Sequence, residues 1–167
     1  MSPPPRIPVP ARVGLHGRLP LVGSLFLAPA HPYHEGPETL LELLNSRVRV
    51  LPFIHAEDGG TIMIARTAIT WVQPDPVVDN ALVRREGIMI SREEEVEVEL
   101  VDGYFARGLI QMELPEDYTR LSDFLNGDDE FFPLLLEEGT AVLLGKAAVR
   151  LVRAYQPSPS LPRVPRH

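Results

Sequence analysis

Apolar and acidic residues alternate strictly along residues 95–100, where Val96 and Val98 separate successive glutamates. This period of two is typical of a β-strand with one buried face, because neighbouring side chains of a strand point to opposite sides. The Asp102-Gly103 pair that follows predicts a tight hairpin turn, since glycine accepts the positive φ that such a turn requires. We therefore expect residues 104–112 to return as an antiparallel second strand.

A short helix and further strands follow this hairpin. Leu121, Phe124 and Leu125 have the spacing that places apolar side chains on one face of a helix. Asn126-Gly127 ends the helix, because both residues tolerate the left-handed conformation of a helix terminus. The remaining predicted strands are residues 131–136 and residues 141–153.

The first half of the chain repeats these blocks in the same order. Its helical segment ends at Asn45 as the second one ends at Asn126, and Pro52 and Pro133 follow at the same distance. The other matching blocks are residues 23–27 with 108–112 and residues 66–72 with 146–152. Blocks that match in one conserved order indicate an internal duplication.

The predicted fold class is all-β with short helices, in two tandem small β-barrel units of the Sm-like or SH3-like kind. The repeats span residues 13–73 and 95–155. A small unit gains from curling into a barrel, because closure hides the open edges of its sheet. One alternative stays open at this point: the two repeats could instead merge into one larger sheet.

Proline marks the two ends and the join. Half of the prolines lie in residues 3–10 and 157–165, so residues 1–12 and 156–167 are predicted to be extended, mobile tails. Residues 74–94 are predicted to be a linker that begins with Pro74-Asp75-Pro76. Within it, Ile88-Met89-Ile90 has the composition of an added strand.

Charge is distributed unevenly along the chain. The net charge is −7, and in residues 86–138 only three arginines oppose sixteen acidic residues. An acidic surface repels nucleic-acid phosphates and attracts basic protein surfaces. Glu95, Glu97 and Glu99 are therefore the predicted docking face for a basic protein partner, and plain solubility is the simpler interpretation of the same residues.

Two stretches resemble a known family. The hairpin at Asp102-Gly103, with Gly108 in its second strand, is similar to the opening hairpin of the Sm-like small barrels, which include the bacterial Hfq group. The closing residues 142–152, with Lys146 in a turn before an alternating strand, resemble that family's last two strands. The chain departs from the pattern because a helix separates its second and third strands. Residues 120–126 also resemble the signature of a widespread bacterial domain of no assigned activity.

The Sm-like resemblance implies RNA binding by basic and aromatic residues at subunit junctions. Arg66 and Lys146 occupy the matching turn positions, and together with Arg150 and Arg153 they form the alternative nucleic-acid site. Single-strand binding needs a positive groove with stacking aromatic side chains. The local excess of acidic residues argues against such a groove, so we expect no nucleic-acid partner.

The sequence offers little catalytic or metal chemistry. It has no cysteine, no glycine-rich phosphate loop and no nucleophile elbow. His31, His34 and His55 lie in two predicted loops, and the prolines around the first pair exclude the helical spacing of a strong metal motif. We therefore expect no catalytic residue, no metal site and no cofactor.

These observations predict a non-enzymatic protein-interaction module, an adaptor or scaffold subunit of a bacterial cytoplasmic assembly. Its expected partners are proteins with a basic surface, or further copies of itself. The alternatives are an Sm-like nucleic-acid-binding protein and a small-ligand binder with a pocket between the repeats.

No apolar run reaches the length of a membrane span of about 18 residues, and the start of the sequence lacks the apolar region of a signal peptide. A cytoplasmic location is the resulting expectation.

Overall fold

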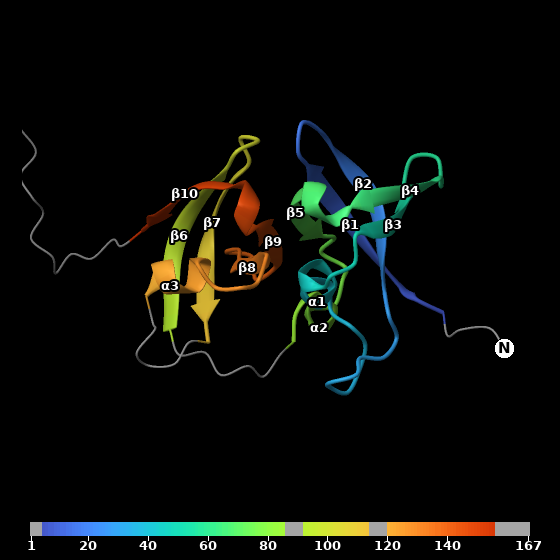
Figure 1. Ribbon diagram of the computed structural model, residues 1–167, viewed down its shortest axis with the longest axis horizontal. Helices are drawn as coiled ribbons and strands as arrows, with labels where there is room; N and C mark the ends of the chain where they lie inside the picture. Colours follow the sequence, from blue (N-terminus) through green and yellow to red (C-terminus); the bar gives the residue numbers. More distant parts are fainter. Residues whose placement is uncertain (1–4, 86–91, 114–119, 156–167) are drawn as a thin grey trace, which may run out of the picture.

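The computed structural model describes residues 5–85, 92–113 and 120–155. In this part of the chain, ten antiparallel strands form one open sheet, and three short helices accompany it. The two halves of the chain lie side by side, each with its own strands and helices (Figure 1). None of the described helices combines the length and the apolar character that a membrane crossing needs.

The first half contains β1 to β5 and two helices. Its elements are β1 (Ile7–Leu15), β2 (Arg18–Leu27), α1 (Leu40–Asn45), β3 (Val50–His55), β4 (Thr61–Ala65), the 3₁₀ turn Arg66–Ala68, β5 (Ile69–Pro74) and α2 (Asn80–Val83).

The second half repeats the same order of strands, helix and 3₁₀ turn. Its elements are β6 (Arg92–Leu100), β7 (Phe105–Met112), α3 (Leu121–Leu125), β8 (Phe131–Leu135), β9 (Ala141–Gly145), the 3₁₀ turn Lys146–Ala148 and β10 (Val149–Ala154). The predicted hairpin at Asp102-Gly103 is confirmed, because Gly103 has φ 87° and the Leu100 amide donates to the Tyr104 carbonyl at 2.8 Å.

The order of strands across the sheet is β10-β6-β7-β8-β9-β5-β1-β2-β3-β4. Each half therefore contributes five consecutive strands, and the two sets meet where β9 pairs with β5. The predicted pair of separate closed barrels is not what forms, because the strands belong to one open sheet. Pairing β5 with β9 gives one edge strand of each half a hydrogen-bonding partner, although neither half closes into a barrel.

Two clusters of buried apolar side chains form the core, and each crosses the boundary between the halves. Trp71 of β5 packs into the second-half cluster, whereas Phe131, Ala141 and Leu143 of the second half pack into the first. The exchange of side chains means that neither half has a self-contained core. We conclude that the halves stabilise one another.

The first strand begins earlier than the proline content predicted. β1 starts at Ile7, inside residues 1–12, which were expected to be a tail. The strand accommodates its prolines on the solvent side: Pro8 and Pro10 are exposed, while Val9 between them is fully buried. β5 pairs with β1 only as far as Ala11, so the strand needs no proline N–H on that side. The predicted strand Ile88-Met89-Ile90 lies outside the described residues.

Gly23 and Gly108 occupy equivalent places in the two halves, where the second strand lies close to the backbone of the third. A Cβ added to Gly23 would lie 2.1 Å from the Ile54 carbonyl oxygen, and one added to Gly108 would lie 2.3 Å from the Leu135 carbonyl oxygen. Both obstacles are backbone atoms that cannot turn aside. The close approach of the second and third strands therefore depends on the missing side chain.

We expect Gly108→Ala to lower the free energy of unfolding by about 1–3 kcal/mol, because the new methyl group must displace the β8 backbone. Urea-induced unfolding followed by tryptophan fluorescence measures the change. Gly60→Ala is the matched control, since its Cβ would meet only the exposed Asp58 side chain, at 3.0 Å, and no backbone of another strand. Equal effects of the two substitutions would contradict the role given to the close approach at Gly108.

Candidate functional site

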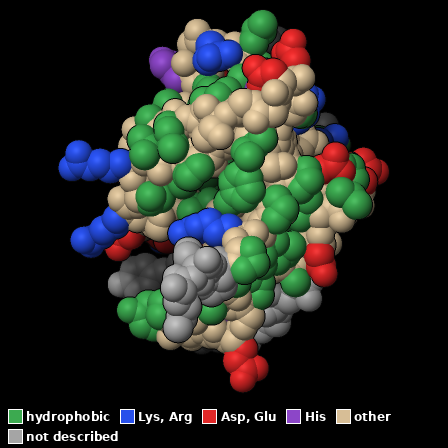
Figure 2. All heavy atoms as spheres, turned by 90° about the vertical axis from the view of Figure 1, so that its right-hand side faces the viewer, with side chains coloured by type: hydrophobic (Ala, Val, Ile, Leu, Met, Phe, Trp, Pro, Cys, Tyr) green, Lys and Arg blue, Asp and Glu red, His purple; other side chains and the backbone are tan. Residues whose placement is uncertain are grey.

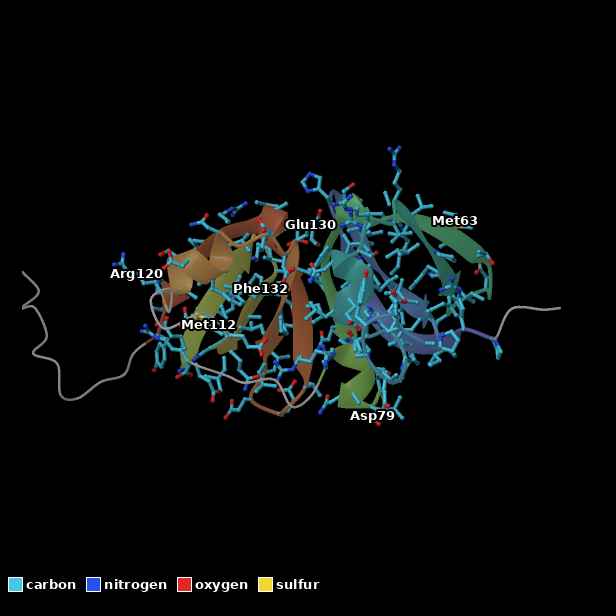
Figure 3. All side chains as sticks on the ribbon, turned by 60° about the horizontal axis from the view of Figure 1, so that its bottom comes forward. Met63, Asp79, Met112, Arg120, Glu130 and Phe132 are labelled. Carbon is cyan, nitrogen blue, oxygen red and sulfur yellow. The ribbon has the colours of Figure 1, made fainter. Side chains whose placement is uncertain are left out.

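The two outermost strands, β4 and β10, are the open edges of the sheet. Met63 on β4 has 62% of its surface exposed and Leu151 on β10 has 40%. Figure 2 views the end of the molecule formed by the first half and shows hydrophobic side chains over much of that face. Met63 lies at this outer end, far from Glu130 at the boundary between the halves (Figure 3). An exposed edge with apolar side chains is a template for pairing with another strand.

The junction between β5 and β9 shows how such edges pair in this fold. Trp71 lies opposite Leu144 and Val72 lies opposite Leu143. All four side chains are buried. The junction therefore joins the fifth strand of one half to the fourth strand of the other through apolar residues.

Polar contacts fix the alignment of this junction. The Phe131 amide donates to Asn45 Oδ1 at 2.8 Å, and Asn45 Nδ2 donates to the Phe131 carbonyl at 3.2 Å. The Asn45 side chain thus imitates a peptide group of a neighbouring strand. Arg66 forms an ion pair with Glu130 across the same boundary, and Thr70 Oγ1 donates to Asp102 Oδ2 at 2.9 Å.

Trp71 reaches across the boundary and is accommodated on both sides. Its ring stacks on Tyr104 with centroids 4.6 Å apart, and burial raises the pKa of the Tyr104 phenol. On the other side it fills the space over Gly14, where an added Cβ would lie 2.1 Å from Trp71 Nε1. The residue that faces the indole therefore has to be glycine.

Glu95, Glu97 and Glu99, the predicted docking face, lie on β6 between β7 and β10 and not at an edge. Each is paired with an arginine of a neighbouring strand: Glu95 with Arg107 at 3.0 Å, Glu97 with Arg153 at 3.7 Å and Glu99 with Arg150 at 3.5 Å. Cross-strand pairs of opposite charge support the sheet itself. Much of the negative charge of this face is balanced within the molecule.

The four basic residues of the alternative nucleic-acid site do not form one free patch. Arg66 is buried and donates to the Val48 and Leu44 carbonyls near the end of α1. Lys146 Nζ donates to the Phe124 and Gly127 carbonyls at the end of α3, and burial lowers its pKa against the opposing effect of nearby aspartates. Arg150 and Arg153 pair with the β6 glutamates as described above.

A cavity of about 550 Å³ lies between the halves. Leu41, Val83 and Arg85 of the first half line it together with Phe132 and Lys146 of the second half. None of its lining residues is a histidine. His55 lies beside Asp58 instead, with Nδ1 3.5 Å from Oδ1.

Sequence reasoning missed the role of Asn45, which it interpreted as a helix stop. The contact with Phe131 joins residues far apart in the sequence, so no local pattern could reveal it. A usable signal did exist in residues 141–144, four consecutive apolar residues whose side chains are all buried. A continuous apolar run of this kind indicates a strand buried on both faces, as in the middle of a large sheet.

Comparisons with known proteins found no family model, curated protein or solved structure that matches the chain.

We expect Asn45→Ala to lower the free energy of unfolding by about 1–3 kcal/mol, because both backbone groups of Phe131 lose their partner. Urea titration at low protein concentration provides the measurement. Asn126→Ala is the matched control, since Asn126 ends α3 in the equivalent place and is exposed. We expect the control to change stability by less than about 0.5 kcal/mol. An equal loss in both variants would contradict the assigned role of Asn45.

Proposed function

We propose that this chain is a non-enzymatic scaffold subunit of a bacterial cytoplasmic assembly, and that it binds other chains through its two open sheet edges. The first partner proposed is a second copy of the chain. One observation carries the proposal. The junction pairs β5, the fifth strand of the first half, with β9, the fourth strand of the second half. The two edges that stay open are β4, the fourth strand of the first half, and β10, the fifth strand of the second half.

We interpret the two halves as duplicated copies of one unit, which makes the open edges equivalent to the paired ones. The recurring order of elements supports this interpretation. So do Arg66 and Lys146, which each follow a fourth strand and donate to carbonyls at the end of a helix. If the units are equivalent, β10 of one chain can pair with β4 of the next as β5 pairs with β9.

The proposed pairing can be stated residue by residue. In the sequence repeat Leu151 and Val152 correspond to Trp71 and Val72, and Met63 and Ile64 correspond to Leu143 and Leu144. The register of the internal junction then places Leu151 opposite Ile64 and Val152 opposite Met63. Pairing would cover the exposed apolar surface of Met63 and Leu151, and burial of such surface is the main source of free energy in association.

The charges at the proposed contact differ from those at the internal junction. Where the internal junction pairs Arg66 with Glu130, the equivalent residues between chains are Lys146 and Arg49, which repel. Asp128 and Asp129 lie close enough to Lys146 to act on its pKa. They therefore offer the negative charge that Arg49 would meet. An association supported by exposed charges weakens as salt is added.

The contact is head-to-tail, so it generates either a closed ring or an open filament. We expect wild-type protein to form species larger than a dimer, and Met63→Asp and Leu151→Asp to be monomeric when each is measured alone. A charge at an edge strand blocks pairing. A mixture of the two variants retains one intact β10 and one intact β4, so it should form a dimer and stop there. Analytical ultracentrifugation measures all four samples.

Val77→Asp is the matched control, because Val77 is an exposed apolar residue that lies outside both edges. It should assemble as wild type does. A monomeric wild-type protein at the highest concentration reached would contradict the proposal. So would dimers of Leu151→Asp alone, since these would require β4 to pair with β4.

The cavity between the halves favours a second candidate function, the binding of a small molecule. Its walls combine apolar side chains such as Phe132 and Val83 with three cations and three acids: Arg84, Arg85, Lys146, Glu113, Asp128 and Asp129. This combination suits an aromatic carboxylate that also carries an amine, because its ring is apolar and it offers a charge of each sign. Saturation-transfer NMR with a panel of aromatic carboxylates that carry an amine should give signals that weaken in Arg85→Glu and persist in Arg12→Glu. An unchanged signal in Arg85→Glu would contradict binding at this cavity.

A further inference from the structure

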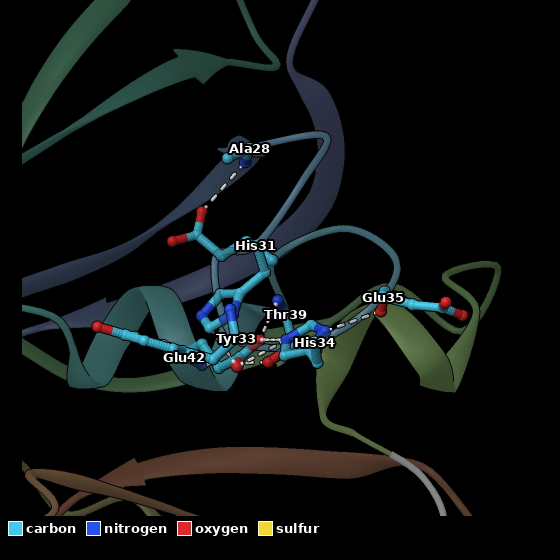
Figure 4. A network of polar contacts seen from close by, with 8 residues as sticks. Ala28, His31, Tyr33, His34, Glu35, Thr39 and Glu42 are labelled. Atoms are coloured by element: carbon cyan, nitrogen blue, oxygen red, sulfur yellow. Dashed lines mark hydrogen bonds and ion pairs between the residues drawn. The ribbon is translucent and has the colours of Figure 1, made fainter.

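His31, His34 and Glu42 converge on one point beside α1. The two histidines flank a turn at Pro32 and Tyr33 and form an isolated antiparallel bridge. Their rings stack with centroids 4.1 Å apart and planes 10° from parallel. Glu42 Oε2 lies 3.2 Å from His31 Nε2 and 2.8 Å from His34 Nε2 (Figure 4). Proline excluded a helical histidine pair, and here a tight turn brings the pair together instead.

The spacing of these atoms is that of ligands around one ion. Zinc binds imidazole nitrogen and carboxylate oxygen at about 2.0–2.2 Å, so tetrahedral ligand atoms lie about 3.3–3.6 Å from one another. The three ligand atoms all lie within 4.8 Å of one another, and the two measured contacts to Glu42 are 3.2 and 2.8 Å. An ion can enter after movements of a few tenths of an ångström for Glu42 and after the two rings tilt out of their nearly parallel stack, because a metal ion lies close to the plane of each imidazole that binds it.

Two of the three ligands, His34 and Glu42, are held in place by a second contact. His34 Nδ1 lies 2.8 Å from the Glu35 carbonyl. Because a carbonyl only accepts, Nδ1 must carry the proton, and in the neutral ring Nε2 then presents a lone pair to Glu42. A hydrogen bond from the distal ring nitrogen to a carbonyl is what usually orients a metal-binding histidine. Glu42 is held by Thr39, whose amide donates to Glu42 Oε1 at 2.9 Å.

Two acceptors that face each other at 2.8 Å need a positive charge between them. Either a proton on Nε2 of His34 or a divalent cation supplies it. Binding of a cation changes the hydrogen bonding of His31, whose Nδ1 accepts a hydrogen bond from the Tyr33 amide at 3.1 Å. Binding through Nε2 requires a proton on Nδ1, so this contact must open. Tyr33 is 89% exposed, and its amide can turn to water.

We propose that His31, His34 and Glu42 form a binding site for a divalent transition-metal ion, of which Zn²⁺ is the best match. Two imidazoles and one carboxylate suit zinc, cobalt or nickel better than magnesium or calcium, which prefer oxygen ligands alone. The side chains retain 18%, 9% and 24% of their exposure, so the ion has a path from solvent. Three protein ligands leave the fourth position open.

The bound ion would tie the loop of residues 28–38 to α1. The base of this loop is already closed, because the Glu38 amide donates to the Ala28 carbonyl at 3.0 Å and the Ala28 amide donates to Glu38 Oε1 at 3.1 Å. Asn45 at the other end of α1 contacts Phe131 across the junction. The metal would therefore stabilise α1, the helix whose Asn45 contacts the second half at the junction.

The test uses the full chain without an affinity tag, first stripped of metal and then titrated with ZnCl₂ by calorimetry and with CoCl₂ by visible absorption. We expect one ion per chain, absorption bands of tetrahedral or five-coordinate Co²⁺, and a higher Tm in the presence of Zn²⁺. His31→Ala and His34→Ala should each weaken Zn²⁺ binding at least about tenfold. His55→Ala is the matched control and should bind as wild type does.

Glu42→Gln separates the metal role from the structural one. Glutamine can still serve in the capping box of α1, so the folded structure measured by circular dichroism should persist while Zn²⁺ affinity falls. The proposal is overturned if the stripped wild-type chain binds no Zn²⁺. It is equally overturned if the His31→Ala/His34→Ala double variant binds as tightly as wild type, or if binding is lost in His55→Ala.

Discussion

The pairing of β5 with β9 is the interaction on which the rest of the structure depends. It places Trp71 opposite Leu144 and Val72 opposite Leu143, and it converts two five-stranded sets into one sheet. Because Trp71 packs into the core of the second half and Phe131 into the core of the first, separating the halves would expose apolar surface on both. Asn45 and Arg66 then fix the alignment that the apolar residues alone would leave loose.

Much of each half could be predicted from local sequence. The turn at Asp102-Gly103 follows from the conformational freedom of glycine, and Gly108 in the second strand marks the close approach of β8. The two prolines lie outside these ladders, because β2 pairs with β3 only beyond Pro52, at Ile54 and His55, and β7 pairs with β8 only beyond Pro133, at Leu135. The junction could not be predicted in this way. Its partners are distant in sequence and carry ordinary apolar side chains, so closure of each half and merger of both halves fit the same pattern.

The charged residues that attracted attention in the sequence have local partners in the fold. Glu97 and Glu99 on β6 contact Arg153 and Arg150 on β10, so strands that looked acidic or basic alone neutralise each other once paired. Arg66, which the family resemblance assigned to nucleic acid, holds the end of α1. Met63 on β4 and Leu151 on β10 are exposed apolar side chains at the two open edges, and the proposed function rests on these strands.

The central claim is that the internal junction recurs between chains, and hydrogen–deuterium exchange measured as a function of protein concentration tests it most directly. The account predicts that the outward-facing backbone amides of β4 and β10, which do not pair with β3 or β6, become protected together as concentration rises, while the amides of β5 and β9 are protected at every concentration. Exchange at these outward-facing amides that stays fast and independent of concentration, or protection confined to one of the two strands, would contradict it.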